Sequence, residues 1–415
     1  GTATGTYNDA NVANATTVTF GGLSLTGAQS GNYTLTIQSP QAATIIKANQ
    51  TITFAALPVK TTADVDFSPG ATSATSGINA ITYTSSNTGV ATIVAGPAIH
   101  IVTAGTSDIT ASQAESANYN AATDVIRTLT VNQASSTTDY FRSKASGNWN
   151  DVATWETSSD GTTNWISATL TPTSTANTIT IRNGNTVTVG ANVTTDQLTI
   201  ENGGQITVSA SQTLTIANGT NTDLSIAGTL VNNGSVTLQG ATTTDVSGIF
   251  TNGGTLTMST GTTSLSVSGT FNTNTNGSIS NTNNGPISFT GTAQYNHTIN
   301  GGTIPTATWA ATSTCYVTGM TSTAPTGIGQ TFGNFRWNCA QTSTNFFNIN
   351  NTLFSTAGEF RIDNTGTSAG VSLSFNNTTA AYSYSFGSIN VTGGLLQLLY
   401  RSGTSSFYPT YVTVS

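Results

Sequence analysis

Ile226-Ala-Gly-Thr-Leu-Val-Asn-Asn-Gly234 is followed by three drifting copies, Val246-Ser-Gly-Ile-Phe-Thr-Asn-Gly-Gly254, Val267-Ser-Gly-Thr-Phe-Asn272 and Phe289-Thr-Gly-Thr-Ala-Gln-Tyr-Asn296. The central glycines of the four phrases, Gly228, Gly248, Gly269 and Gly291, recur with a nearly constant spacing. A period of about 21 residues is typical of a stacked β-solenoid, in which each coil buries its apolar face against the next one. The repeat therefore predicts an elongated fold.

Short runs around the repeat alternate apolar and polar residues, as in Thr178-Ile-Thr-Ile181, Thr186-Val-Thr-Val189 and Thr213-Leu-Thr-Ile216. Alternation with a period of two indicates strands with one buried face. Threonine is β-branched, so the polar face also favours strands. We therefore expect a right-handed parallel β-helix over residues 177–415, with about eleven coils of about 21 residues each.

The repeat also assigns structural roles to particular side chains. The four repeat glycines are expected at the coil corners, where they supply either a positive φ or a close approach between backbones. Asn232 and Asn252 both lie four residues after a repeat glycine. They are therefore expected to stack on adjacent coils as a ladder of side-chain amides.

The chain has two cysteines, Cys315 and Cys339. Their separation in the sequence is close to one coil, and neighbouring coils stack about 4.8 Å apart, within the Cα separation of about 7 Å that a disulfide bridges. The sequence thus leaves two alternatives, a disulfide or two buried free thiols. A disulfide would imply export to an oxidising compartment.

Residues 1–134 have a different texture. Residues 1–47 contain a partial β-rich module, and residues 48–134 contain six short strand-like runs separated by regular turn signals. This rhythm predicts a β-sandwich, so the whole chain is expected to be all-β. The expected strands are Thr51–Phe54, Ile81–Tyr83, Ala91–Val94, Ile99–Val102, Asp108–Ala111 and Arg127–Val131.

Residues 135–176 form a Trp-rich segment directly before the regular repeats. Trp149, Trp155 and Trp165 lie close together in it, although the whole chain has only five tryptophans. A solenoid must shield the open end of its core, so this segment is predicted to be a cap or linker. The alternative is a platform on which the flat rings bind sugars.

Composition limits the partners of the chain. Charged residues make up 6% of the sequence and the net charge is −7, with no cluster of Lys or Arg that could follow a phosphate backbone. No run of about 18 apolar residues occurs. We therefore expect neither nucleic-acid binding nor membrane insertion.

Two sets of motifs add resemblances to known families. Gln50-Thr-Ile-Thr-Phe54 and Tyr83-Thr-Ser-Ser-Asn-Thr-Gly-Val-Ala91 resemble bacterial immunoglobulin-like domains of surface proteins, and residues 1–47 resemble the repeat modules that precede such domains in Bacteroidota. Phe141-Arg-Ser-Lys-Ala-Ser-Gly-Asn-Trp149 and Gln330-Thr-Phe-Gly-Asn-Phe-Arg-Trp-Asn-Cys339 resemble the β-helical regions of very large Bacteroidota cell-surface proteins. These resemblances imply an internal segment of a giant protein exported by the type IX secretion system, similar to gliding-motility adhesins.

Residues suited to catalysis are sparse. Beyond Asn202 the acidic residues are Asp223, Asp245, Glu359 and Asp363. Asp223 and Asp245 stand at similar repeat positions, so they could stack as a carboxylate pair, but exposed turn residues are the commoner case. Glu359, Arg361 and Asp363 alternate along a predicted strand, where a surface ion pair is expected. His100 is expected on a strand surface and His297 in a turn, and no catalytic, cofactor-binding or metal-binding residues are predicted.

These observations favour a non-enzymatic rod or stalk of a long extracellular adhesin or filament on the bacterial cell surface, serving attachment or gliding. The alternative is a polysaccharide-binding β-helix at an adhesive tip, and a polysaccharide lyase or hydrolase is a third hypothesis. The candidate partners are flanking domains of the same chain, a surface polysaccharide and further copies of the chain itself.

Overall fold

A computed structural model describes residues 1–73, 79–341, 347–349, 354–366, 371–375, 383–400, 406–409 and 412–414. The chain forms two compact units, residues 1–134 and residues 135–415. Among the described residues, the helical segments are two short 3₁₀ turns, Ser30–Asn32 and Val152–Thr154, and all other regular elements are strands. The predicted all-β class is confirmed.

Residues 1–47 of the first unit carry a small antiparallel sheet of β1 (Thr4–Tyr7), β2 (Thr17–Gly21) and β3 (Gln41–Ala42). This sheet covers little of the apolar surface that the sequence provides. Several large apolar side chains of the segment are exposed, namely Leu23, Leu25, Tyr33, Leu35, Ile37 and Ile46.

Residues 48–134 have a hydrophobic core of their own. One sheet has the strand order β5 (Lys60–Thr61), β11 (Val125–Asn132), β10 (Gly105–Ser112), β7 (Thr82–Ser85), and two further antiparallel pairs are β8 (Ala91–Val94) with β9 (Ala98–Ile101) and β4 (Ile52–Thr53) with β6 (Thr72–Ser73). The buried residues that form the core are Ile52, Phe54, Val90, Ala91, Ile99, Ile101, Ile109, Ala111, Ala122, Leu129 and Val131.

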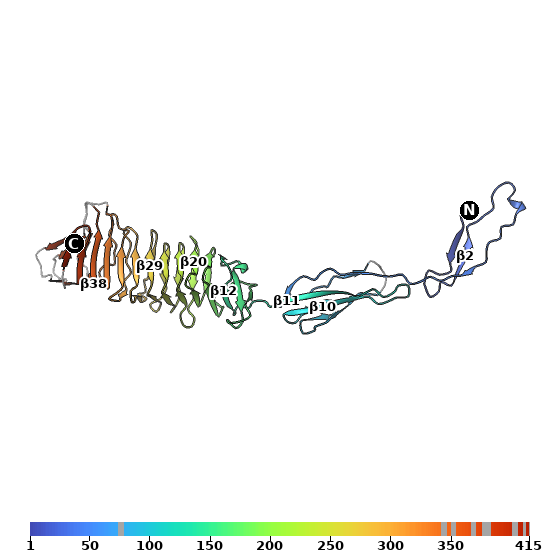
Figure 1. The fold of residues 1–415 in the computed structure, drawn as a ribbon, viewed down its shortest axis with the longest axis horizontal. Coiled ribbons are helices and arrows are strands. Elements are labelled where there is room, and N and C mark those ends of the chain that lie inside the picture. Colours follow the sequence, from blue (N-terminus) through green and yellow to red (C-terminus); the bar gives the residue numbers. More distant parts are fainter. Residues whose placement is uncertain are drawn as a thin grey trace. The chain divides into compact units, whose positions relative to one another are not determined.

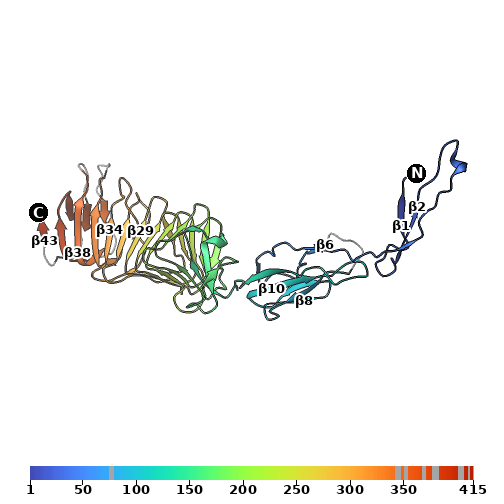
Figure 2. The ribbon, with the colours of Figure 1, turned by 45° about the vertical axis from the view of Figure 1, so that its right-hand side comes forward.

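The second unit is a parallel β-solenoid of about eight turns, visible as a stack of successive coils in Figures 1 and 2. Three sheets run along it. The first has the order β15 (Ile166–Ser167), β14 (Trp155–Ser158), β12 (Tyr140–Ser143), β16 (Thr178–Ile181), β19 (Leu198–Ile200), β22 (Leu224–Ile226), β25 (Thr243–Val246), β28 (Ser264–Val267), β31 (Ile287–Phe289), β33 (Thr308–Trp309). The short third sheet has the order β18 (Val193–Thr195), β21 (Thr213–Ile216), β24 (Ser235–Leu238), β27 (Thr255–Met258), β30 (Ser278–Ser280).

The second sheet is the longest. Its main path has the order β13 (Gly147–Asn148), β17 (Thr186–Val189), β20 (Gln205–Val208), β23 (Thr229–Asn232), β26 (Ile249–Asn252), β29 (Thr270–Thr273), β32 (Gln294–His297), β34 (Thr314–Val317), β36 (Asn334–Asn338), β38 (Ser355–Asn364), β40 (Ser383–Val391), β42 (Ser406–Pro409). Off this path, β35 (Thr331–Phe332) pairs with β38 and β43 (Val412–Val414) pairs with β40. A separate small sheet has the order β37 (Phe347–Ile349), β39 (Val371–Phe375), β41 (Leu396–Tyr400).

The solenoid core is made of like residues stacked coil upon coil. Phe250, Phe271 and Tyr295 are partners in the ladder of β26, β29 and β32. Their ring centroids are 4.8 and 6.0 Å apart, and all three side chains are fully buried. Such contacts add about 0.5–1.5 kcal/mol per aromatic pair to the burial of apolar surface. Each coil is therefore stabilised chiefly by its neighbours.

The coils differ in length, which the fixed period does not capture. Thr229, Ile249 and Thr270 follow one another in the ladder at nearly even steps, whereas the step from Phe335 to its partner Phe360 is clearly longer. At this longer step the pairing of β36 with β38 also shifts register, between Trp337 and Asn338. The structure has about eight turns, whereas the sequence predicts about eleven.

The glycine column is confirmed for three of the four predicted corners. A Cβ on Gly248 would lie 2.2 Å from the carbonyl oxygen of Gly228, and a Cβ on Gly269 would lie 2.2 Å from that of Gly248. These glycines therefore permit a close approach between successive coils. Gly291 has the other expected role, because it lies in a turn with a φ of +55°, and Ala293 takes the next place in the column.

The predicted amide ladder is present. Asn232 and Asn252 are paired in register and fully buried, and Nδ2 of Asn232 donates to Oδ1 of Asn252 at 2.8 Å. The ladder continues to the backbone, since Nδ2 of Asn252 donates to the carbonyl oxygen of Ser278 at 2.9 Å. Buried amides of this kind are tolerated because their hydrogen bonds are made within the protein.

Of the two alternatives for the cysteines, the structure has the buried free thiols of Cys315 and Cys339 and no disulfide between them. The local coil is shorter than the separation of the two cysteines, so the ladder pairs Cys315 with Phe335 and leaves Cys339 farther along the chain. Burial raises the pKa of both thiols, that of Cys339 to about 12, which disfavours the reactive thiolate.

Candidate functional site

The Trp-rich segment belongs to the start of the solenoid. β12 and β13 pair in parallel with β16 and β17, so residues 135–176 add the first strands of both long sheets. Trp149 and Trp155 are 1% and 0% exposed and pack edge to face, with ring centroids 5.0 Å apart. Nε1 of Trp149 donates to the carbonyl oxygen of Pro172, and Nε1 of Trp155 donates to that of Trp149. The two rings therefore close the first end of the core.

Trp165 lies outside this pair. The guanidinium of Arg142 lies over its ring, 3.8 Å from the ring centroid, and Arg142 itself is paired with Glu156. A sugar-binding platform needs open aromatic faces, but two of the three rings are buried and the third is covered by a cation. The arrangement supports the cap.

Asp223 and Asp245 are not stacked. The ladder pairs Asp245 with Ser225, so the two aspartates are two positions out of register. Asp223 is buried and accepts hydrogen bonds from the backbone N–H groups of Gly219 and Thr243, both at 2.7 Å. The neighbour of Asp223 is Asp196, whose pKa is raised by burial and then by the charge of Asp223. These contacts give Asp223 a structural role in the turn.

His297 is a buried core residue, so its predicted place in a turn is wrong. Its Nε2 lies 2.6 Å from the carbonyl oxygen of Gly301, which only accepts, and its Nδ1 lies 3.3 Å from the hydroxyl of Tyr295. That hydroxyl in turn accepts a hydrogen bond from Thr273. Burial lowers the pKa of His297, so the neutral imidazole joins a satisfied chain of hydrogen bonds. His100 is exposed beside Asp66, with 2.7 Å between Nδ1 and Oδ1, on the surface of β9 as expected.

The solenoid carries a concentrated group of charges on the outer face of β34, β36 and β38. We call the residues Tyr316, Arg336, Glu359, Arg361 and Asp363 the polar patch. Arg336 and Arg361 are direct partners in the ladder, and each strand alternates these outward side chains with core residues such as Phe335 and Phe360. The predicted alternation of residues 359, 361 and 363 along one strand is therefore correct.

A network of ion pairs holds the polar patch together. Asp363 bridges the two guanidiniums, because Nε of Arg336 donates to Oδ2 and Nε of Arg361 donates to Oδ1 at 2.7 Å. Burial opposes ionisation of Asp363, but the hydrogen bonds from Arg361, Arg336 and Thr392 outweigh it and lower its pKa. Asp363 is therefore a carboxylate at neutral pH and offsets the repulsion between the two arginines.

The polar patch borders a hollow of about 310 Å³ on the outer face of the longest sheet. Side chains of four successive coils surround the hollow, and most of them are polar. The lining residues are Gln294, Thr314, Tyr316, Asn334, Phe335, Arg336, Glu359 and Arg361.

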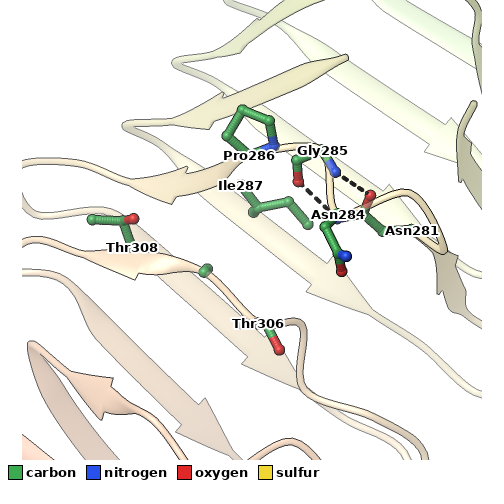
Figure 3. A pocket seen from close by; sticks show the side chains of 8 residues that line it. Asn281, Asn284, Gly285, Pro286, Ile287, Thr306 and Thr308 are labelled. Atoms are coloured by element: carbon green, nitrogen blue, oxygen red, sulfur yellow. Dashed lines mark hydrogen bonds between the residues drawn. The ribbon is translucent and has the colours of Figure 1, made fainter. Parts of the chain in front are cut away.

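A second hollow, of about 260 Å³, lies where the short third sheet ends at β30. Figure 3 shows it between the turn that carries Asn284 and the next coil, which carries Thr306 and Thr308. Asn281 fixes this turn by accepting from the N–H of Gly285 and donating to its carbonyl oxygen, both at 2.8 Å. No charged residue lines this hollow, so it offers weaker electrostatic contacts than the polar patch.

Two further features are absent from the described residues: a group of side chains that could bind a metal ion and a membrane-spanning helix. No three His, Cys, Asp or Glu side chains of the described residues come together in a group that could hold a metal ion. Within the same ranges, no helix has the length and hydrophobicity to cross a membrane.

The comparison with known families concerns the start of the first unit. The family model of the YDG domain matches residues 1–43, the stretch that contains β1, β2 and β3. Among curated proteins and among solved structures, none matches this chain.

Proposed function

We propose that this chain is a non-enzymatic structural segment of a long extracellular surface protein, in which the solenoid serves as a stiff stalk for cell-surface attachment or gliding. The observation that carries the proposal is the continuous core of the solenoid. Buried aliphatic and aromatic residues are stacked in parallel register from Phe141 to Ile389. Because each coil contacts only its neighbours, such a fold gains length without needing a larger core.

The composition of the outer surface supports the same function. Outward positions of the strands are mostly Thr, Ser and Asn, which keep the solenoid hydrated without charge. Polar uncharged surfaces and buried backbone hydrogen bonds also leave few accessible sites for proteases, which suits a protein exposed outside the cell.

The finer architecture of the first unit belongs to the same proposal. We infer that residues 48–134 are an immunoglobulin-like sandwich, with the sheet of β5, β11, β10 and β7 facing the hairpin of β8 and β9. A core of their own and strands of this size support that assignment. Modules of this kind joined to a solenoid fit the gliding-adhesin resemblance and export by type IX secretion from a member of the Bacteroidota.

The state of the carboxylates supports a non-enzymatic function. Asp363 is held as an ion by two arginines, so it would be a poor proton donor, and Asp223 is buried and saturated by hydrogen bonds. Hydrolysis of a glycosidic bond needs two carboxyl groups that flank one sugar linkage, one of them able to give up a proton.

The test is the location of the protein on the cells that encode it. Antibodies raised against residues 135–415 should label intact cells as strongly as permeabilised cells, and protease added outside should remove the label. An antibody against a cytoplasmic protein is the control, since it should label permeabilised cells alone. Labelling of the solenoid that requires permeabilisation would contradict a surface stalk.

A further inference from the structure

Charge is spread very unevenly along the solenoid. Beyond Asn202 the sequence has few acidic or basic residues, namely Asp223, Asp245, Arg336, Glu359, Arg361, Asp363 and Arg401. Four of these belong to the polar patch, and Arg401 lies outside the described residues. A stalk has no structural need for adjacent arginines, because like charges placed directly opposite each other on neighbouring strands destabilise a sheet. Their presence indicates a local task for this face.

The side chains around the hollow are fixed before any ligand arrives. The guanidinium of Arg336 lies over the ring of Tyr316, 4.8 Å from its centroid, and the Tyr316 hydroxyl accepts from Nδ2 of Asn338 at 2.8 Å. Glu359 accepts from Nδ2 of Asn390 at 3.0 Å. Groups held in this way lose little conformational entropy when a ligand binds.

The same groups keep hydrogen-bonding capacity in reserve. Arg336 and Arg361 use Nε for Asp363, while their terminal amino groups have no hydrogen-bond partner among the described residues. Their side chains are 42% and 34% exposed. Glu359 uses Oε1 for Asn390 and keeps Oε2 as a free acceptor within the same described ranges. The hollow therefore presents both donors and acceptors to solvent.

We propose that this hollow binds an uncharged linear polysaccharide that lies along the solenoid axis. Two arginines and two carboxylates balance each other, so the patch does not select for an anion, whereas mixed donors and acceptors suit hydroxyl groups. The lining strands β32, β34, β36 and β38 are about 4.8 Å apart, which makes the site about 14 Å long. A sugar unit is about as long as this strand spacing, so the site holds about three units. This site goes beyond the proposed stalk, which stands without it.

The experiment is isothermal titration calorimetry of the complete chain with cellohexaose, xylohexaose and mannohexaose, and with hexagalacturonate as the acidic probe. At least one uncharged hexasaccharide should bind with saturation, and the corresponding monosaccharide should bind at least about tenfold more weakly. Arg336→Gln and Glu359→Gln should each weaken that binding about tenfold or more, because each loses a hydrogen bond that involves a charged group.

Arg182→Gln is the matched control. Arg182 is also a half-exposed arginine paired with a carboxylate, Glu156 at 3.1 Å, but it lies far along the chain from the polar patch. Its binding should equal that of the wild type, and circular dichroism should show every variant folded. The proposal is overturned if no uncharged hexasaccharide binds, if hexagalacturonate alone binds, or if Arg182→Gln weakens binding as much as Arg336→Gln.

Discussion

The tetrapeptide Thr-Leu-Thr-Ile occurs in both units, at residues 34–37 and at residues 213–216, with opposite fates. In the solenoid it forms β21, and Leu214 and Ile216 are both 0% exposed. In the first unit the same letters lie outside any strand, and Leu35 and Ile37 are 37% and 43% exposed.

The difference lies in the neighbours. β21 has β18 on one side and β24 on the other, and both partners repeat its alternation in register. Residues 34–37 have no such partners among the described residues. An alternating pattern thus specifies which residues can share a face, whereas burial depends on a second alternating segment that lies one coil away.

The largest contrast is expected from truncating the two leucines. Leu214→Ala should lower the free energy of unfolding of the solenoid by about 2–5 kcal/mol, because it leaves a cavity among fully buried neighbours. Leu35→Ala should change stability by less than about 0.5 kcal/mol, because its side chain is already partly in water. Calorimetry of the complete chain reports on both units. Equal losses for the two variants would show that residues 34–37 pack in a way that the exposed fractions do not reveal.

A pair of glycines should give the next largest contrast. In Gly248→Ala the new Cβ would lie 2.2 Å from the carbonyl oxygen of Gly228, so the coils must separate locally. Overpacking of this kind costs about 1–3 kcal/mol. Gly31→Ala, in the exposed segment, meets no atom within 4 Å and should be nearly neutral. Urea unfolding of the complete chain measures both effects. If Gly248→Ala unfolds at the same urea concentration as the wild type, the coils do not approach each other as closely as the structure indicates.

The amide ladder gives a smaller contrast. Asn252→Ala removes the acceptor for Nδ2 of Asn232 and the donor to Ser278, which should cost about 1–3 kcal/mol. Asn32→Ala, at an exposed position, should leave the melting temperature unchanged. Thermal melting followed by circular dichroism distinguishes the two, and a neutral Asn252→Ala would remove the ladder from the sources of stability.

How much of this fold the sequence predicts depends on coil length. Where successive coils keep the regular period, counting along the chain identifies true neighbours, as for Gly228 with Gly248 and Asn232 with Asn252. The count fails at Gly291, because the local coil is longer and places Ala293 above Gly269. The alternation of buried and partly exposed residues survives such a change, since β29 and β32 on either side of the longer coil keep the same burial pattern.

The sequence predicted the part of the polar patch that lies on one strand, Glu359, Arg361 and Asp363, but missed its continuation on the neighbouring strands for the same reason. Arg336 and Arg361 belong to a long coil, so a fixed period places them several positions out of register, although the ladder makes them direct partners. The distribution of charge along the sequence could have indicated the patch. Charged residues are scarce beyond Asn202, yet four of them lie within residues 336–363. Trp149 and Trp155 are the opposite case, because they stand out in the sequence as a candidate binding surface but are buried in the cap.

The smallest contrast concerns acid. The folded-state pKa of Asp363 lies below its value in the unfolded chain, so the unfolded chain takes up the proton first and the stabilising effect is present above about pH 4 and lost as the pH falls below it. Asp363→Asn should therefore lower the free energy of unfolding at pH 7 by less than about 1.5 kcal/mol, which lowers the melting temperature slightly. The difference from wild type should vanish on acidification.

Asp9 is the matched control for this titration. Its pKa is also lowered, chiefly by the backbone N–H of Asn11, but it lies in residues 1–47, outside the solenoid. All five tryptophans belong to residues 135–415, so tryptophan fluorescence follows the solenoid alone. Asp9→Asn should leave this melting curve unchanged at every pH. If the difference between Asp363→Asn and wild type stays constant down to the lowest pH at which the chain remains folded, the ion pairs of the polar patch contribute nothing that depends on the charge of Asp363, and the patch must be held by packing.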